Sequence, residues 1–250
     1  MIIELSGPSA SGKTEFCRFL LRKLPDAYSV RRSTNRATAV TSRIRLLKCA
    51  APELIRSPAV ARDALRWLSC HRAEGLPPIR EAVRLAGEYC ALRGANEDSN
   101  IWLLDQGRLQ LGSWVPRSVE QDALRHADQL RGFVTIGNAV VILAVHPTLA
   151  TNRMRQRGDL QWGHAVANAR GFSSFTELCR FEFENVCSKV ELAQALGAAV
   201  LRIEISRHAE IRNHVLLPAL TTTEGSDLLG NKALSILQMI DGLFTNWWSP

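Results

Sequence analysis

Residues 7–14 have the residue types and the spacing of a phosphate-binding loop. They read Gly-Pro-Ser-Ala-Ser-Gly-Lys-Thr, which fits G-x-x-x-x-G-K-[ST] at every fixed position. Glycines at both ends let the backbone turn so that N–H groups point at a phosphate chain, and a following helix adds its positive end. In such a loop Lys13 reaches the β- and γ-phosphates and the hydroxyl of Thr14 binds Mg²⁺. We therefore predict a nucleoside triphosphate site formed by Gly7, Ser9, Ala10, Ser11, Gly12, Lys13 and Thr14.

The sequence on either side of the loop supplies the strand and the helix that position it. Residues 2–6 are a short, mostly apolar stretch, and residues 15–24 place apolar side chains at helical spacing. The alternative is a glycine-rich turn that merely precedes a helix. The agreement of motif, strand and helix argues against that alternative.

Asp105 is the best acidic candidate for the same site. It directly follows Ile-Trp-Leu-Leu, residues 101–104, which we interpret as a buried strand. At a strand tip beside a phosphate loop, an aspartate can hold the water shell of Mg²⁺ or accept a proton from an attacking hydroxyl. The alternative is a surface aspartate that caps the next helix. Strand position and polarity favour the first interpretation, so we predict Asp105 as a catalytic residue and, with Thr14, as a metal-site residue.

Two arginines near the end of a helix expected over 147–157 are candidates for charge neutralisation. Arg153 and Arg157 are four positions apart and therefore share one face, whereas Arg155 points elsewhere. Two guanidinium groups on one face can clamp a phosphoryl group and neutralise the charge that develops during its transfer. A solvated basic helix end is the alternative. Residues 158–172, with three glycines and little apolar periodicity, are expected to form a mobile cover that excludes water.

The basic segment after the second expected strand, 27–31, indicates an anionic acceptor. We predict Arg31 and Arg36 as acceptor-binding residues; a solvated run of charge is the alternative. Of the 31 basic residues only five are lysine, and the net charge is +7. Arginine suits phosphate and carboxylate because its planar fork matches them. Since no zinc spacing or run of interleaved basic and aromatic residues points to nucleic acid, we favour a small-molecule acceptor without excluding nucleic acid.

Apolar stretches alternate between strand and helix patterns along the chain. Besides those already named, strands are expected over 100–105, 139–146 and 199–205, and helices over 52–70, 79–93, 118–131 and 174–196. This alternation predicts a mainly parallel sheet with helices on both faces and functional loops at its carboxyl edge. A length of 250 residues suits a single α/β domain. A helix over 226–246 carries an apolar stripe that we expect to pack on its own domain rather than on a partner.

Composition favours a cytoplasmic protein. No run of about 18 apolar residues predicts a membrane span. Six cysteines are scattered without a C-x-x-C pair, as is typical of reduced thiols. Because a strand is expected from residue 2, we expect no signal peptide. The oligomeric state, including a homodimer, stays open.

Taken together, these segments resemble the P-loop kinases of the nucleoside and nucleoside-monophosphate kinase type, including thymidylate-kinase-like proteins. The matching pieces are residues 7–14, the Leu-Leu-Asp-Gln-Gly of 103–107, and 141–158 with its Arg-x-x-x-Arg. The resemblance implies a three-layer α/β sandwich with a parallel five-stranded sheet in the order 2-3-1-4-5. It also implies a helical acceptor-side insertion around 37–94 and a lid around 153–172.

The same resemblance implies ATP as donor, with Mg²⁺, and a role for each matching residue. Lys13 and Thr14 would serve the donor phosphates and Mg²⁺, Asp105 would be the carboxylate of the third strand, and Arg153 and Arg157 would be lid arginines. The expected reaction is transfer of the γ-phosphoryl group to a nucleotide or nucleoside. Two alternatives stay open: a kinase of a sugar nucleotide or antibiotic, and a regulatory P-loop protein whose hydrolysis is slow. A GTPase switch is disfavoured because the chain has no N-K-x-D segment.

Overall fold

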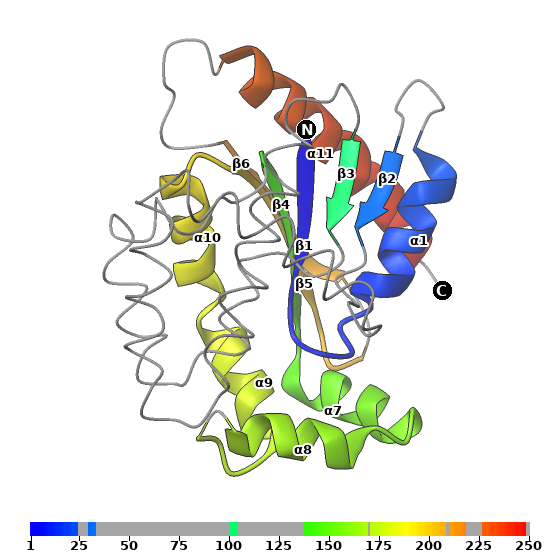
Figure 1. The fold of residues 1–250 in the computed structure, drawn as a ribbon, viewed down its shortest axis with the longest axis vertical. Helices are drawn as coiled ribbons and strands as arrows, with labels where there is room; N and C mark the ends of the chain where they lie inside the picture. Colours follow the sequence, from blue (N-terminus) through cyan, green and yellow to red (C-terminus); the bar gives the residue numbers. More distant parts are fainter. Residues whose placement is uncertain are drawn as a thin grey trace, which may run out of the picture.

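A central sheet with helices on both faces organises the part of the chain that the structure describes (Figure 1). The structure is a computed structural model, and it describes residues 1–24, 30–33, 101–104, 138–169, 171–208, 211–218 and 227–248. The helices expected over 52–70, 79–93 and 118–131 lie outside the described residues, as does the insertion around 37–94.

Within the described residues, six strands form the sheet, in the order β2-β3-β1-β4-β5-β6. Their bounds are Ile2–Ser6 for β1, Val30–Ser33 for β2, Ile101–Leu104 for β3, Ala139–Val145 for β4, Ala199–Ile205 for β5 and Ile211–Leu217 for β6. The first five run parallel, and β6 pairs antiparallel with β5. Every residue of β1 and β4 is buried, which explains the nearly continuous apolar sequence of β4.

The expected sheet of five parallel strands in the order 2-3-1-4-5 was wrong in one respect, because the observed sheet is mixed and has a sixth strand. The sequence pattern of β6 hides it: Arg212, Asn213 and His214 are exposed and polar. A strand that pairs on one side only tolerates such residues, so it lacks the apolar signal of a central strand.

Within the described residues, α1, α10 and α11 cover the faces of the sheet, and α7, α8 and α9 pack on one another beyond the ends of the strands (Figure 1). Their bounds are Lys13–Lys23 for α1, Pro147–Gln156 for α7, Leu160–Ala169 for α8, Phe175–Glu184 for α9, Val186–Ala195 for α10 and Asp227–Trp248 for α11. α1 and α11 pack on one face, where the ring centroids of Phe16 and Phe244 lie 4.7 Å apart. On the opposite face, α10 packs against Val140 and Ile142 of β4. None of the helices that the structure describes has the length and hydrophobicity that a membrane crossing requires.

The single helix expected over 174–196 is divided into α9 and α10. Its start was predicted correctly, since the backbone N–H of Glu177 donates to the hydroxyl of Ser174 at 3.1 Å. The helix stops at Asn185, whose side-chain amide donates to the carbonyl oxygen of Phe181 at 2.8 Å. The backbone N–H of Asn185 donates to the same oxygen at 3.1 Å, and a new helix begins at Val186.

The segment 158–172, expected to form a mobile cover, is helical over most of its length. Gly163 misled the sequence analysis because a glycine inside a helix can serve packing rather than flexibility. A β-carbon on Gly163 would lie 3.1 Å from ring atoms of Phe175, so the glycine lets α8 approach α9 closely. Ala167 and Phe172 are buried in the main core. This segment is thus a packed helical layer, and its movement over a bound nucleotide stays a proposal.

Candidate nucleotide-binding site

The phosphate-binding loop connects the end of β1, which lies between β3 and β4 in the sheet, to the start of α1. Both the strand and the helix predicted to flank it are confirmed. Gly7, Ala10 and Gly12 have positive φ angles of 148°, 63° and 93°, which curl the backbone. A β-carbon on Gly7 would lie 2.6 Å from the carbonyl oxygen of Leu143 in β4. Glycine is therefore required at this position, because the loop leaves the sheet in contact with the neighbouring strand.

Lys13 turns back over the loop from the first turn of α1. Its ammonium group donates to the carbonyl oxygens of Gly7 and Pro8, each at 2.7 Å, and to the hydroxyl of Ser11 at 3.1 Å. The side chain is 6% exposed, so its charge is held inside the loop by oxygen acceptors. Phosphate oxygens are acceptors of the same kind with more negative charge, and they can replace these carbonyls.

Thr14 follows Lys13 in the first turn of α1 and is half-buried. Its hydroxyl is a hard oxygen ligand, which fits Mg²⁺ held together with phosphate oxygens and water. Within the described ranges, no three His, Cys, Asp or Glu side chains gather as a metal-binding group.

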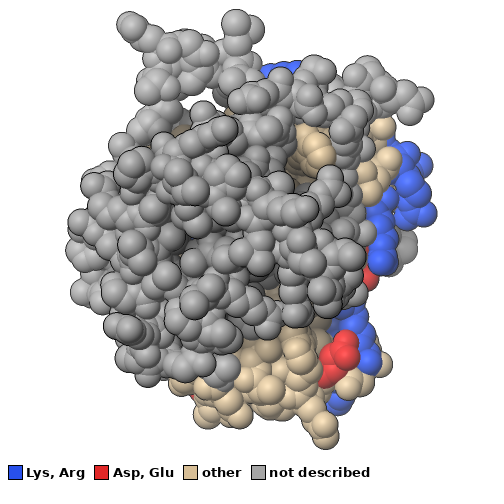
Figure 2. Space-filling model, viewed as in Figure 1, with Lys and Arg blue, Asp and Glu red and all other residues tan. Residues whose placement is uncertain are grey.

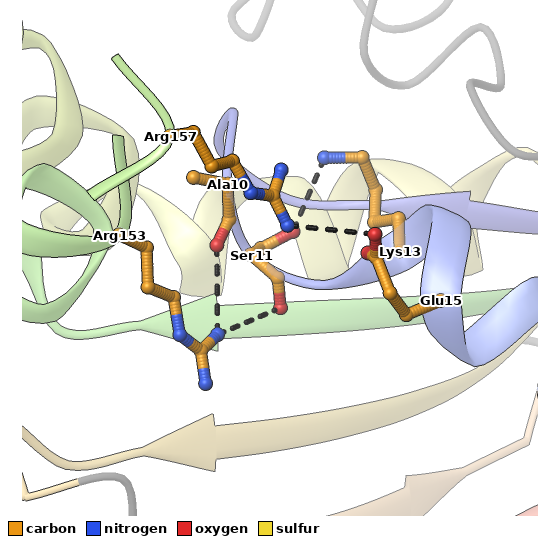
Figure 3. Close-up of polar contacts among 6 residues, drawn as sticks. All are labelled: Ala10, Ser11, Lys13, Glu15, Arg153 and Arg157. Carbon is orange, nitrogen blue, oxygen red and sulfur yellow. Dashed lines mark hydrogen bonds and ion pairs between the residues drawn. The ribbon is translucent and has the colours of Figure 1, made fainter. Parts of the chain in front are cut away.

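Arg153 of α7 and Arg157, which directly follows this helix, both point toward this loop (Figure 3). A terminal nitrogen of Arg153 lies 3.5 Å from the carbonyl oxygens of Ala10 and of Ser11. A terminal nitrogen of Arg157 lies 3.5 Å from a carboxylate oxygen of Glu15 in α1. The structure thus brings the two predicted arginines to the loop that carries Lys13.

Arg155 takes no part in this cluster. It is exposed, and it donates to the side-chain oxygen of Asn152 on its own helix at 3.1 Å. Arg155 was predicted to point away from the shared face of Arg153 and Arg157, and this is confirmed. Arg155 is therefore a natural control for the two arginines beside it.

The positive charges of the site affect one another. Burial lowers the pKa of Arg153, the positive charge of Arg157 lowers it further, and the negative charge of Glu15 acts in the opposite direction. Lys13 adds a third cation, and the start of α1 adds the positive end of a helix. Figure 2 shows further Lys and Arg side chains along this edge of the molecule, over α1 and α7. An anionic ligand would relieve the repulsion among these groups.

α7 is held firmly where it presents its arginines. It begins at Pro147, and the ring nitrogen Nδ1 of His146 accepts from the backbone N–H of Thr148 at 3.3 Å. The hydroxyl of Thr151 donates to the carbonyl oxygen of Pro147 at 2.8 Å and lies 3.0 Å from the hydroxyl of Thr176 in α9. These contacts fix the direction in which the arginine face points.

Three other predicted site residues are Asp105, Arg31 and Arg36. Asp105 and Arg36 lie outside the described residues, although Asp105 directly follows Leu104, the last residue of β3. Arg31 lies in β2, in register with Trp102. Glu15 was not predicted from the sequence, where its one available signal is an acidic side chain directly after Thr14.

Comparisons with known proteins show likeness only at the level of solved structures. No protein-family model matches the chain, and no curated protein matches it. Deoxyadenosine kinase from M. mycoides with bound dATP is 14% identical, over 93% of this chain and 98% of that chain, with a TM-score of 0.43. A structure of the PezAT chromosomal toxin-antitoxin system of Streptococcus pneumoniae is 11% identical, over 98% of this chain and 86% of that chain, with a TM-score of 0.37. Likenesses this distant carry no argument about activity, so the case for a function rests on the loop and the side chains around it.

Proposed function

We propose that this protein is an ATP-dependent phosphotransferase that moves the γ-phosphoryl group of ATP to a small-molecule acceptor. The acceptor that we propose is a nucleotide or nucleoside. The observation that carries the proposal is the convergence of Arg153 and Arg157 with Lys13 on one phosphate loop. Binding a nucleotide needs only the loop and its lysine. Two further cations from a separate helix suit a reaction in which charge develops on a transferring phosphoryl group.

The donor would be bound by the loop and the start of α1. Backbone N–H groups of residues 7–14 and the ammonium of Lys13 would hold the β- and γ-phosphates. Thr14 would hold Mg²⁺, and Asp105 would hold the water shell of the ion. When bound, the metal neutralises charge on the phosphate oxygens.

The transfer itself is a displacement at the γ-phosphorus. The acceptor oxygen forms a bond to that phosphorus while the bond to the oxygen bridging the β- and γ-phosphorus atoms breaks, and ADP leaves. A proton on an acceptor hydroxyl passes to Asp105 or to water. Arg153 and Arg157 would stabilise the oxygens of the phosphoryl group, and Arg31 and Arg36 would bind an anionic group of the acceptor. Catalysis then comes from positioning and charge neutralisation, with no covalent intermediate on the protein.

The test is ATP turnover with Mg²⁺ against a panel of nucleosides, nucleoside monophosphates, sugar nucleotides and aminoglycosides. ADP formation stimulated by one acceptor, with phosphate recovered on that acceptor, would support the proposal and identify the substrate class. Lys13→Ala is the control, and we expect it to remove most of the turnover while circular dichroism shows a folded protein. Slow turnover that ignores every acceptor would favour a nucleotide-binding regulatory protein instead. Turnover by Lys13→Ala near that of the native protein would show that the site is wrongly assigned.

A further inference from the structure

Glu15 and Arg157 form an ion pair between the first turn of α1 and the end of α7. The two atoms of the pair, a terminal nitrogen of Arg157 and a carboxylate oxygen of Glu15, are 3.5 Å apart (Figure 3). Glu15 directly follows Thr14 in the first turn of α1, the helix that begins at the phosphate loop. It also interacts electrostatically with Arg153, although it forms its direct contact with Arg157.

In this ion pair, a phosphate group can readily replace the carboxylate of Glu15 as the partner of Arg157. Its side chains are 46% and 45% exposed, and water screens a pair of this kind so that it contributes little to stability. Carboxylate and phosphate present the planar guanidinium group with the same arrangement of acceptor oxygens. A triphosphate carries more negative charge than one carboxylate, so it competes well for the same arginine.

We propose that Glu15 is a placeholder for the triphosphate, holding Arg157 beside the loop in the nucleotide-free protein and releasing it to the γ-phosphate when ATP binds. Glu15 is then a positioning residue that acts through Arg157. The inference rests on the proposed function only for triphosphate binding at the loop, and it does not depend on phosphoryl transfer. Because the proposed transfer of Arg157 to phosphate breaks the ion pair, the carboxylate weakens nucleotide binding while keeping the arginine in place.

The proposal predicts that the effect of Glu15 depends on Arg157. Glu15→Gln removes the charge and keeps the shape of the side chain, and we expect it to tighten binding of a non-hydrolysable ATP analogue about two- to fivefold. In a protein that already carries Arg157→Gln, the same change is expected to leave the dissociation constant unaltered. Isothermal titration of the native protein, both single variants and the double variant, at one salt concentration with Mg²⁺, gives the four constants of this cycle.

A matched control separates the ion pair from net charge. Glu191 of α10 is exposed and lies in the helical layer on the other face of the sheet, so Glu191→Gln makes the same charge change far from Arg157. It is expected to leave the dissociation constant unchanged. Thermal unfolding followed by circular dichroism checks that every variant is folded.

The outcomes distinguish this inference from the proposed function. Equal tightening by Glu15→Gln with and without Arg157 would overturn the inference, because Glu15 would then act by repelling the nucleotide directly. No tightening at all would overturn it as well. Tightening that requires Arg157, in a protein that phosphorylates no acceptor, would support the placeholder and count against the phosphotransferase. A native protein that does not bind the analogue would overturn both.

Discussion

The α-carbon of Gly7 faces the backbone carbonyl oxygen of Leu143 so closely that a β-carbon on Gly7 would lie 2.6 Å from that oxygen. The contact joins the start of the phosphate loop to the middle of β4. It fixes the position of the loop relative to β4, the strand that leads into α7. The donor loop and the helix with the two arginines are therefore positioned by the same strand.

We expect Gly7→Ala to lower the free energy of unfolding by about 3 kcal/mol and to abolish nucleotide binding. The φ angle of 148° is unfavourable for alanine, and the new methyl group would meet a backbone oxygen that cannot move aside. Gly171→Ala is the matched control. The φ angle of Gly171 is 78°, but a β-carbon there would have no atom within 4 Å. We therefore expect Gly171→Ala to lower the free energy of unfolding by about 1–2 kcal/mol, the cost of placing alanine in the left-handed conformation. Urea unfolding of both variants measures the difference, and equal losses would show that the contact with Leu143 is unimportant.

Replacing Arg153 and Arg157 one at a time tests their assignment. Arg153→Ala and Arg157→Ala are each expected to reduce kcat about 100-fold, because each would remove a cation that stabilises the transferring phosphoryl group. Arg155→Ala is expected to leave kcat unchanged, since Arg155 binds Asn152 on its own helix. Steady-state kinetics with a saturating acceptor provides the values. Full activity in both of the first two variants would contradict the phosphotransferase mechanism and would fit a protein that only binds nucleotide.

The packing of α11 against α1 should be one of the strongest contributions to stability. Phe244 is 1% exposed, and its ring meets that of Phe16 edge-on, with an interplanar angle of 77°. We expect Phe244→Ala to lower the free energy of unfolding by about 3–5 kcal/mol. Gln238→Ala on the exposed side of the same helix should change it by less than about 0.5 kcal/mol. Chemical unfolding compares the two, and a small loss for Phe244→Ala would mean that α11 is only loosely attached.

The parts of the site that could be predicted from the sequence are those whose geometry is local. A phosphate loop is specified by its own glycines and lysine, so Gly7 and Lys13 could be assigned without knowledge of the fold. Arg153 and Arg157 share a face because helical spacing places them there. Both inferences depend on residues within one or two turns of each other.

The features that could not be predicted depend on contacts between distant segments. Gly163 is indistinguishable in sequence from a flexible glycine until Phe175 is placed against it. The ion pair of Glu15 and Arg157 arises only when α1 and α7 are brought to the same edge of the sheet. Asn185 separates α9 from α10 although the residues around it have helical spacing, and its side-chain amide donates to the carbonyl oxygen of Phe181.

The way α7 is attached has a consequence for local opening. Ala150 and Met154 belong to the same core cluster as Val141 of β4 and Phe16 of α1, so α7 cannot detach without disrupting that core. We expect its backbone amides to exchange with deuterium at the rate of the central strands and not at the faster rate of a mobile flap. On gradual heating, such a protein keeps its arginines in place up to the transition at which the whole domain melts.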